Sequence, residues 1–299
     1  MAEAARDRAQ AALARGLALE DTGDFAAAFD CFREATELDP SCGRAWRLAG
    51  NLLRRSGRLG PASECFERAI AGGDDPALNA FFLSAVGVGE VVAAPPGGFV
   101  AQLFDQYADR FDAHLRQELN YRAPQRLFEA VARPGAARHA RVLDLGCGTG
   151  LAGLAFKPIA DAIVGVDVSS RMLAHAERTG AYEALVHDSI EHYLASTEPA
   201  AFDLVICCDA FNYVGALDAA FAGVRRALRP GGGFAFTVEL TAARAGIDLL
   251  ASLRYAHARP YVEGVAERHG YLTQALVEVT LREEDGEPVE GLAVCLQRP

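Results

Sequence analysis

The sequence predicts an α/β domain with a mostly parallel sheet, preceded by a smaller all-α domain. Two patterns predict this. Small and aromatic residues recur at a 34-residue offset near the start of the chain, and short apolar strands alternate with helical segments from residue 141 onward. A Gly/Pro-rich stretch at 87–98 separates the two patterns. We therefore expect helical repeats and a capping helix in 1–86, a linker in 87–98, and the α/β domain in 99–299.

The composition is that of a folded chain, with 51% hydrophobic residues among 299. The net charge of −11 argues against a nucleic-acid partner, because phosphate binding needs clustered positive charge. The seven cysteines show no C-x-x-C spacing, which indicates reduced thiols and no metal site. No signal peptide is visible, and no apolar run reaches the roughly 18 residues that a membrane span needs. We expect a cytoplasmic protein that does not bind membranes.

The first quarter of the chain contains an internal repeat. Gly23-Asp24 and Gly57-Arg58 interrupt two helical patterns at equivalent positions, so each unit is predicted to be a helix, a tight turn and a second helix. A further helix is expected at 77–86. The repeated positions are Gly16, Gly23, Ala28, Phe32 and Ala35, which recur as Gly50, Gly57, Ala62, Phe66 and Ala69. The small residues allow close helix packing, and the two phenylalanines fill the groove between units.

This 34-residue unit resembles the tetratricopeptide repeat over roughly residues 9–86, most closely in 23–40. Trp46 and Gly50 match the start of the second copy, whereas Ala12 stands where a tryptophan is common. Two repeats and a cap are few, since about three units are usually needed for a continuous core. The repeats therefore have two interpretations, which the sequence leaves open: a docking groove for a protein or peptide, or an arm for packing or homodimerisation.

The second half alternates strands with helices, which predicts a parallel sheet covered on both faces. Its last two strands are close together, which predicts an antiparallel edge. Two amphipathic helices are expected between Phe99 and Arg133, and a turn at 229–233 leads into the fifth strand. The expected strands are 141–145, 162–166, 184–187, 202–207, 234–238, 274–283 and 290–297, and the last helices are expected at 217–228 and 260–269.

A glycine-rich loop, Gly146-Cys-Gly-Thr-Gly150, follows the first strand directly. Glycines at this point allow the backbone to approach a ligand closely. Asp167 ends the second strand, 21 residues after Gly146, where a carboxylate suits the two hydroxyls of a ribose. These features fit any adenosine ligand.

The type of adenosine ligand is decided by what precedes the loop. Gly148 to Gly153 match the dinucleotide fingerprint G-x-G-x-x-G, which is a weak signal alone and keeps a nicotinamide-dependent dehydrogenase as an alternative. However, Gly146-Cys147 separate that match from the strand, and Asp144 lies within the strand's end. A carboxylate there repels a pyrophosphate but suits a ligand that carries an ammonium and a sulfonium.

The segment Asp-Leu-Gly-Cys-Gly-Thr-Gly, residues 144–150, resembles motif I of the class I S-adenosylmethionine-dependent methyltransferases. Asp188-Ser189 after the third strand and the turn at 229–233 fit the same family, so the resemblance covers roughly 99–299. It implies a Rossmann-like seven-stranded methyltransferase sheet with an antiparallel last strand, and S-adenosyl-L-methionine as the cofactor. The pairing with repeats resembles a bacterial group of repeat-containing predicted methyltransferases.

The resemblance also implies a cofactor site. Asp144 would help to hold the amino group of the methionine part, Asp167 the ribose hydroxyls, and Asp188 the adenine amino group; the alternative for Asp188 is a helix cap. The implied cofactor-binding residues are Asp144, Gly146, Cys147, Gly148, Gly150, Asp167, Val168, Met172, Asp188, Ser189, Ile190 and Cys208.

The methyl acceptor is expected beside the loop after the fourth strand, under a helix at 104–115 that resembles the lid of small-molecule methyltransferases. His257 is the first candidate for a general base, followed by Tyr107 or His114; alternatively, Tyr255 and His257 only brace the insertion after the fifth strand. The catalytic candidates are His257, Tyr107, His114 and Asp209, and the substrate-binding candidates are Tyr121, Phe211, Tyr213, Tyr255 and Tyr261.

Methyl transfer is a displacement on an already activated carbon, so the protein mainly aligns and desolvates the reactants, and a base helps for a hydroxyl or ammonium acceptor. Segment 208–213 lacks the Asn/Asp-Pro-Pro-Tyr signature of many N-methyltransferases. The aromatic lining and the acidic charge favour a small or carrier-bound metabolite. The alternatives are methylation of a protein docked on the repeats, and a scaffold whose α/β domain only senses the cofactor.

Overall fold

The computed structural model describes residues 2–117, 119–132, 138–284 and 286–299; for residue 2 and residues 109–117 it describes the backbone alone. The chain divides into two compact units. The first runs to Pro96 and includes the segment Leu249–Arg254, and the second comprises Gly97–Asp248 and Tyr255–Pro299. The division after Pro96 lies in the stretch expected to be a linker. The segment Leu249–Arg254 differs from expectation, because the sequence assigned it to the second domain.

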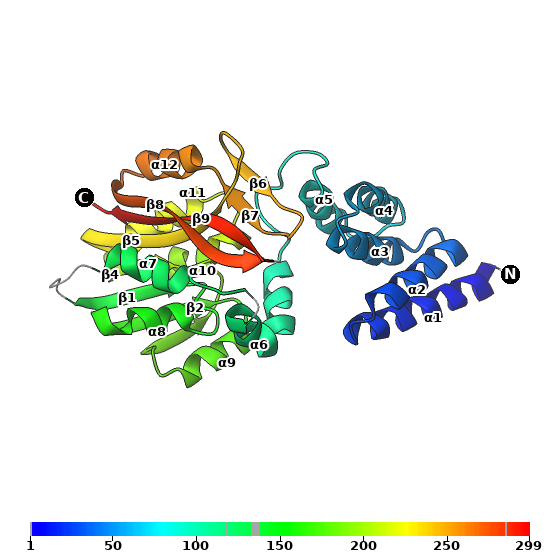
Figure 1. Cartoon of the computed structure of the whole chain (residues 1–299), viewed down its shortest axis with the longest axis horizontal. Helices are drawn as coiled ribbons and strands as arrows, with labels where there is room; N and C mark the ends of the chain where they lie inside the picture. Colours follow the sequence, from blue (N-terminus) through cyan, green and yellow to red (C-terminus); the bar gives the residue numbers. More distant parts are fainter. Residues whose placement is uncertain (1, 118, 133–137, 285) are drawn as a thin grey trace. The chain divides into compact units, whose positions relative to one another are not determined.

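The first unit consists of antiparallel helix pairs and one further helix, drawn from blue to cyan in Figure 1. Asp24 caps the second helix by accepting a hydrogen bond from the Ala27 amide, and Asp75 caps the fifth by accepting from Ala77 and Leu78. The helices are α1 (Ala2–Asp21), α2 (Phe25–Leu38), α3 (Gly43–Arg55), α4 (Leu59–Ala71) and α5 (Pro76–Ala85).

The repeated glycines make room for the repeated phenylalanines. A Cβ on Gly16 would lie 2.4 Å from the Phe32 ring, and a Cβ on Gly50 would lie 2.8 Å from the Phe66 ring. Both rings are fully buried, and Phe66 also stacks on Phe82 of α5 with 5.1 Å between ring centroids. The 34-residue pattern therefore arises because each helix pair needs a glycine where the phenylalanine ring packs. Phe66 also contacts the next helix, α5, through Phe82.

The second unit is an α/β domain with helices on both faces of one sheet (Figure 1). Its helices are α6 (Phe99–Gln117), α7 (Ala123–Val131), α8 (Leu151–Phe156), α9 (Ser170–Arg178), α10 (Ile190–Ser196), α11 (Asp218–Ala227) and α12 (Arg259–Arg268), with short 3-10 helices η1 (Lys157–Ile159) and η2 (Phe211–Tyr213). Its main strands are β1 (His139–Leu145), β2 (Ala160–Asp167), β3 (Ala184–His187), β4 (Phe202–Cys207), β5 (Leu228–Leu240), β8 (Leu272–Glu284) and β9 (Glu287–Gln297).

The main strands lie in the order β3-β2-β1-β4-β5-β9-β8. The first five are parallel, and β9 is antiparallel to both β5 and β8. This confirms the predicted seven-stranded sheet. Within the described residues the sheet also contains two strands of three residues each, β6 (Ile247–Leu249) and β7 (Tyr255–His257), with β7 parallel to the end of β5. Such short strands show no alternation in the sequence, and they were not predicted.

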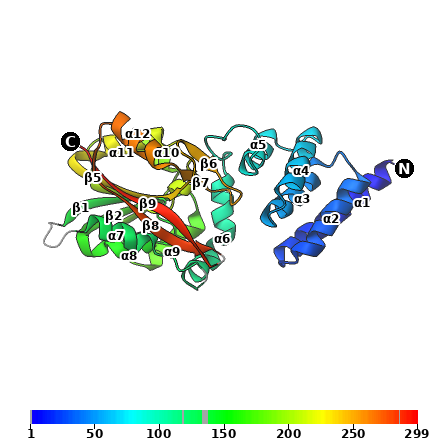
Figure 2. The same cartoon turned by 45° about the horizontal axis from the view of Figure 1, so that its top comes forward.

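Alternate residues of each central strand enter two different cores. Leu143, Val205 and Phe234 pack under α10, α11 and α12. Val142 and Leu204 pack on the opposite face against α7 and α8. Figure 2 shows the β8–β9 hairpin running past α7, and the amide of Arg122, just before α7, donates to Leu281 on β8. Because β1, β2, β3 and β4 run parallel to one another, their carboxyl ends meet at one edge of the sheet.

The approach to the fifth strand differs from the prediction. The segment expected as a turn, 229–233, belongs to β5, and its pairing with β4 shifts register there: Phe202 pairs with Leu228, but Leu204 pairs with Gly233. The glycines thus form an irregular section of a long strand and not a separate turn.

Candidate active site

The glycine-rich loop turns tightly between two neighbouring segments. The amides of Gly146 and Cys147 donate to the Val166 carbonyl on β2 at 2.8 and 3.0 Å. Gly146 has a φ of 67°, and a Cβ on it would lie 2.3 Å from the Cβ of Ala210, which follows β4 by three residues. Position 146 therefore requires glycine for two reasons, its backbone conformation and its close contact with Ala210.

The other two glycines of the motif differ in their surroundings. Gly148 has a φ of 53°, and a Cβ on it would meet no atom within 4 Å, so this position faces open space. Its amide donates to Asp167 at 2.8 Å. Gly150 instead packs against Tyr182 and α9, where a Cβ would lie 3.0 Å from the tyrosine ring. Gly148 is thus suited to a ligand, and Gly150 to helix packing.

Asp167 is held rigidly at the end of β2. Its two oxygens accept hydrogen bonds from the Gly148 amide and from the Ser169 amide, each at 2.8 Å, and the residue is 8% exposed. Burial raises its pKa, which the two amides partly offset. Each carboxylate oxygen keeps a further lone pair, so Asp167 can still accept two ribose hydroxyls. Beside it, Met172 is buried in α9, and the Val168 carbonyl contacts His187.

Asp144 is completely buried, and in the described ranges one of its two oxygens has a hydrogen-bond partner. Oδ2 accepts a hydrogen bond from the Tyr182 hydroxyl at 2.7 Å, whereas Oδ1 has no hydrogen-bond partner among the described residues. Burial raises the pKa of Asp144 to about 7. A buried carboxylate oxygen without a donor is costly, and it fits a ligand that brings an ammonium group or a bound water to this position.

The expected adenine contacts lie at the start of α10. Ser189 caps this helix by accepting from the His192 amide, so the capping role belongs to Ser189 and not to Asp188. The Asp188 carboxylate accepts from the Ser189 amide and contacts His192 Nδ1 at 2.7 Å. Ile190 would lie 3.9 Å from a Cβ on Gly146, which brings this segment beside the glycine-rich loop.

A second group of polar residues gathers beside the first, and we call it the acceptor-side cluster: Tyr121, Cys208, Asp209, Glu239 and Arg282. The Tyr121 hydroxyl lies 3.7 Å from the Cys208 sulfur. Arg282 is 2% exposed and contacts Glu239 at 2.5 Å and Asp209 at 3.5 Å. Burial lowers the pKa of Arg282, but these carboxylates together with Glu284 raise it above its usual value. Arg282 therefore stays charged.

Asp209 adopts a backbone conformation that is unusual for a residue other than glycine, with a φ of 61°. Its amide donates to Thr237 Oγ1 at 2.8 Å. Its Oδ1 accepts from the Asn212 side chain at 2.5 Å, and the Asn212 amide oxygen accepts from the Glu239 backbone at 3.0 Å. Strained residues held by many contacts are typical of functional sites.

The structure corrects three of the acceptor-side predictions. Phe211 is fully buried among the aromatic rings of the core, and Tyr255 is also fully buried. His257 is fully buried, its Nε2 donates to the Gly215 carbonyl at 2.8 Å, and burial lowers its pKa to about 4. A base without access to an acceptor cannot take its proton. The alternative role of Tyr255 and His257, bracing the insertion, therefore fits the structure better.

Two further acceptor candidates have contacts within the protein. The Tyr261 hydroxyl accepts from the Leu217 amide at 2.9 Å, and its ring stacks on His257. Tyr213 is half-buried and meets Phe104 of α6 edge-on, with 4.8 Å between centroids. Tyr261 thus fixes the start of α11, whereas Tyr213 lies under α6.

Helix α6, the expected lid, contacts the loops after β2 and β4. The Ser169 hydroxyl donates to Asp105 at 2.6 Å, and Arg171 donates to the Asp105 carbonyl at 2.8 Å. Tyr107 on this helix is half-buried. The side chain of His114 lies outside the described residues, so its predicted role remains a prediction.

Sequence reasoning missed two residues of this region, Tyr182 and Arg282. Tyr182 precedes β3 and Arg282 lies in β8, and neither belongs to a motif. The one available signal for Arg282 is a charge within a strand expected at the sheet's edge, and a charge there is usually solvated. Only the tertiary fold shows that both side chains point at site carboxylates.

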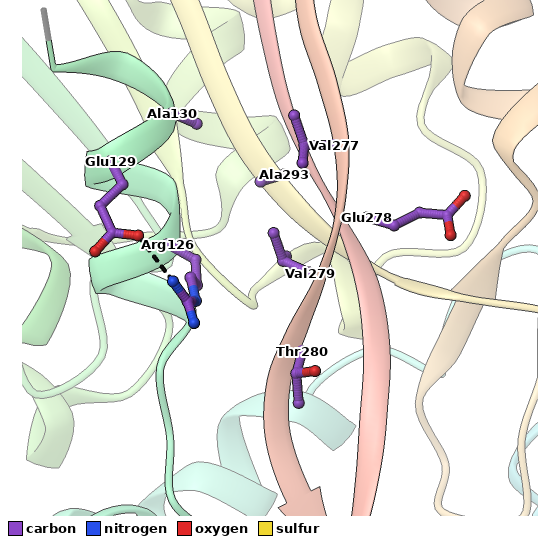
Figure 3. A pocket seen from close by; sticks show the side chains of 8 residues that line it. All are labelled: Arg126, Glu129, Ala130, Val277, Glu278, Val279, Thr280 and Ala293. Carbon is purple, nitrogen blue, oxygen red and sulfur yellow. Dashed lines mark hydrogen bonds and ion pairs between the residues drawn. The ribbon is translucent and has the colours of Figure 1, made fainter.

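A groove of about 460 Å³ lies between α7 and the β8–β9 hairpin. Figure 3 shows Arg126 and Glu129 paired on the helix side and valines on the strand side. The groove is lined by Arg126, Glu129, Ala130, Val277, Glu278, Val279, Thr280 and Ala293, none of which was predicted as a site residue. Across the described ranges, no cluster of potential metal ligands is found, and none of the helices meets the length and hydropathy needed to cross a membrane.

Comparison with known proteins agrees with this geometry. A methyltransferase domain model matches residues 143–234, and a tetratricopeptide repeat model matches residues 9–52. The chain is 38% identical over 139 residues to a malonyl-acyl-carrier-protein O-methyltransferase of Enterobacter lignolyticus; the match covers 46% of this chain and 52% of the relative. It is 31% identical over 189 residues to the enzyme of that name from Erwinia pyrifoliae, covering 61% and 68% respectively. The chain thus spans about half the length of the first relative.

A solved structure shares the fold. The 1,6-didemethyltoxoflavin-N1-methyltransferase of Burkholderia thailandensis, with S-adenosylhomocysteine bound, superposes with a TM-score of 0.55 at 16% identity, covering 70% of this chain and 93% of its own. At that identity the likeness concerns the fold alone.

The fold is that of a Rossmann-like methyltransferase domain joined to helical repeats. The chain belongs to the S-adenosylmethionine-dependent methyltransferase family, and it carries a tetratricopeptide repeat region. The predictions of fold class, family and family cofactor are therefore confirmed.

Proposed function

We propose that this protein transfers a methyl group from S-adenosyl-L-methionine to an oxygen atom of a small or carrier-bound metabolite. One observation carries the proposal: the acceptor-side cluster directly adjoins the glycine-rich loop, since Ala210, the neighbour of Asp209, occupies the space beside Gly146. A cofactor in the loop and an acceptor at Asp209 would then be neighbours, as an in-line displacement requires.

The chain's own residues fit the cofactor. The unpartnered Oδ1 of Asp144 suits the ammonium group, Asp167 suits the ribose hydroxyls, and the open position at Gly148 leaves room for the ligand. When bound, S-adenosylmethionine supplies a methyl group already activated by the positive sulfur. The protein needs only to hold the two reactants and exclude water.

Asp209 is the best candidate to receive the acceptor's proton. Within the described part of the chain, its carboxylate contacts are those of Oδ1 with Asn212 and Arg282, and the side chain is 19% exposed. Asn212 and Arg282 therefore orient the carboxylate and leave its other oxygen for an acceptor hydroxyl. This replaces His257 as the proposed base, because Asp209 has the access that His257 lacks.

The accepting atom is inferred from the relatives. The two relatives described above are both named as O-methyltransferases of a carrier-bound acyl group. The match with them covers about half to two thirds of their length, so the acceptor of this chain is a proposal.

The test is the identity of the methylated product. The purified chain is incubated with methyl-labelled cofactor and either a bacterial lysate or malonyl-acyl-carrier protein, and the label is located by mass spectrometry. We expect an O-methylated small or carrier-bound product. With a hydroxyl acceptor, the variant D209N should reduce kcat at least about tenfold while leaving cofactor affinity nearly unchanged. The ionised carboxylate of malonyl-acyl-carrier protein has no proton to lose, so with that substrate only the identity of the product is tested. Label found only on nitrogen or carbon atoms would contradict the proposal.

A protein docked on the repeats is the second candidate acceptor, supported by the tetratricopeptide repeat match at 9–52. In that case the label from the lysate would be found in a polypeptide, and a variant lacking residues 1–90 would lose it. If the role of the chain in the cell survives D167A, which removes the proposed ribose contact, the scaffold interpretation would replace the enzyme.

A further inference from the structure

Three glycines, two at the start of α8 and one in β2, make room for one tyrosine. A Cβ would lie 2.4 Å from Tyr182 at Gly153, 2.8 Å at Gly165 and 3.0 Å at Gly150. These glycines lie in α8, in β2 and at the N-cap of α8. Any side chain at the first two positions would displace the ring. The sequence therefore provides a cavity shaped for Tyr182.

The tyrosine ring uses this space to reach across a strand. Tyr182 precedes β3, and its hydroxyl donates to Asp144 on β1, although β2 lies between these two strands. Gly165 is the β2 residue in register with Asp144, so the absence of a side chain there opens the way. Gly153 completes an apparent dinucleotide fingerprint in the sequence. In the structure it has a different role, because the lack of a side chain there leaves room for the hydroxyl end of Tyr182.

We propose that Tyr182 is a positioning residue for cofactor binding, which holds Asp144 through Oδ2 and leaves Oδ1 to accept a hydrogen bond from the ammonium group of the cofactor. The inference rests on the proposed cofactor site. Geometry carries it: the 2.7 Å hydrogen bond to one oxygen, the buried and unpartnered second oxygen, and the three glycines that admit the ring.

The arrangement makes cofactor affinity depend on pH in a defined direction. Asp144 must be ionised to pair with an ammonium group. Burial raises its pKa, the Tyr182 hydroxyl lowers it, and the negative charge of Asp167 raises it. The thiols of Cys147, Cys207 and Cys208 also face Asp144; burial raises their pKa values, so they stay neutral.

The experiment is calorimetric titration of the full chain with S-adenosyl-L-homocysteine between pH 6 and 8.5. We expect Y182F to bind about tenfold more weakly at pH 7, because a hydrogen bond to a charged group is lost. The pH at which affinity is half-maximal should rise by about one unit, and the deficit should shrink at pH 8.5. The variant D144N should bind weakly with little dependence on pH in this range, and Y182F/D144N should match D144N.

The matched control is Y271F. Tyr271 donates a buried hydrogen bond to the Phe221 carbonyl in the core under α11, so this variant loses an equivalent hydroxyl without touching Asp144. Its affinity and pH midpoint should equal those of the wild type.

The outcomes are distinguishable. If Y182F has the affinity and pH midpoint of the wild type, Tyr182 only fills space. The same conclusion holds if Y182F weakens binding by the same factor in the D144N background as in the wild type. If Y182F does not fold, D144N decides: wild-type affinity and pH dependence in that variant would overturn the proposal. If the wild-type chain itself does not bind S-adenosylhomocysteine, the proposed function fails and not this inference alone.

Discussion

The buried His257 of the second unit makes a pH-dependent contribution to stability. Burial lowers the pKa of His257 to about 4, whereas a histidine in an unfolded chain titrates near 6.5. At His257 the unfolded state therefore binds a proton between these values and the native state does not, so the stability that this neutral ring contributes is lost as the pH falls from 6.5 towards 4. The imidazole thus acts as a neutral structural donor to Gly215.

The variant H257Q keeps a side-chain donor but has no group that titrates in this range. We expect its loss of unfolding free energy between pH 7 and pH 4.5 to be smaller than that of the wild type by about 1–3 kcal/mol. Urea unfolding at the two pH values measures this difference. Equal losses in both proteins would mean that His257 is not buried as a neutral ring.

Some site residues could be predicted from the sequence and others could not, and the reason is physical. Asp144 and Asp167 end strands next to a glycine-rich loop, so local order alone predicts their place. Tyr182 and Arg282 approach the site across the sheet, and their positions depend on strand order and register. The sequence does not show that His257 is buried, because a polar residue near an aromatic cluster has the same sequence pattern whether it is buried or exposed.

At the scale of elements, the glycine-rich loop and the segment after β4 lie so close together that the loop has no room for a side chain at position 146. The variant G146A places a Cβ 2.3 Å from Ala210, and alanine is also disfavoured at a φ of 67°. We expect a loss of about 2–4 kcal/mol in unfolding free energy together with weaker cofactor binding.

Its matched counterpart is G148A, where a Cβ meets no protein atom within 4 Å. That variant should lose only about 1 kcal/mol of stability, from backbone strain, yet it should still weaken cofactor binding. In the double variant G146A/A210G part of the stability should return. Denaturant unfolding checks the series, and equal losses from G146A and G148A would rule out the clash with Ala210.

Element positions were predicted well wherever periodicity was strong. β3 and β4 match the sequence-based ranges, and α12 differs by one residue at each end. The failures have local causes: β6 and β7 are too short to alternate, and the glycines at 231–233 lie in an irregular part of β5 where composition alone suggests a turn. The repeats could be recognised because the same packing contact, a glycine against a phenylalanine ring, occurs in both copies and needs the same residues at the same spacing.

At the scale of the whole molecule, the chain has two compact units. We expect two calorimetric unfolding transitions, because such units commonly unfold separately. S-adenosylhomocysteine binds only the second unit in our proposal, so at about 100 times its Kd it should stabilise one transition by about 2.7 kcal/mol and leave the other unchanged. A single transition that shifts as a whole would contradict independent units.

The most direct measurement is the affinity of the purified chain for S-adenosyl-L-homocysteine, by calorimetry at pH 8, in the wild type and in D167A. We predict one binding site per chain in the wild type and at least about tenfold weaker binding in D167A, because two charge-assisted hydrogen bonds to the ribose are lost. The absence of binding, equal affinity in D167A, or binding of a nicotinamide dinucleotide in its place would contradict the proposed cofactor site.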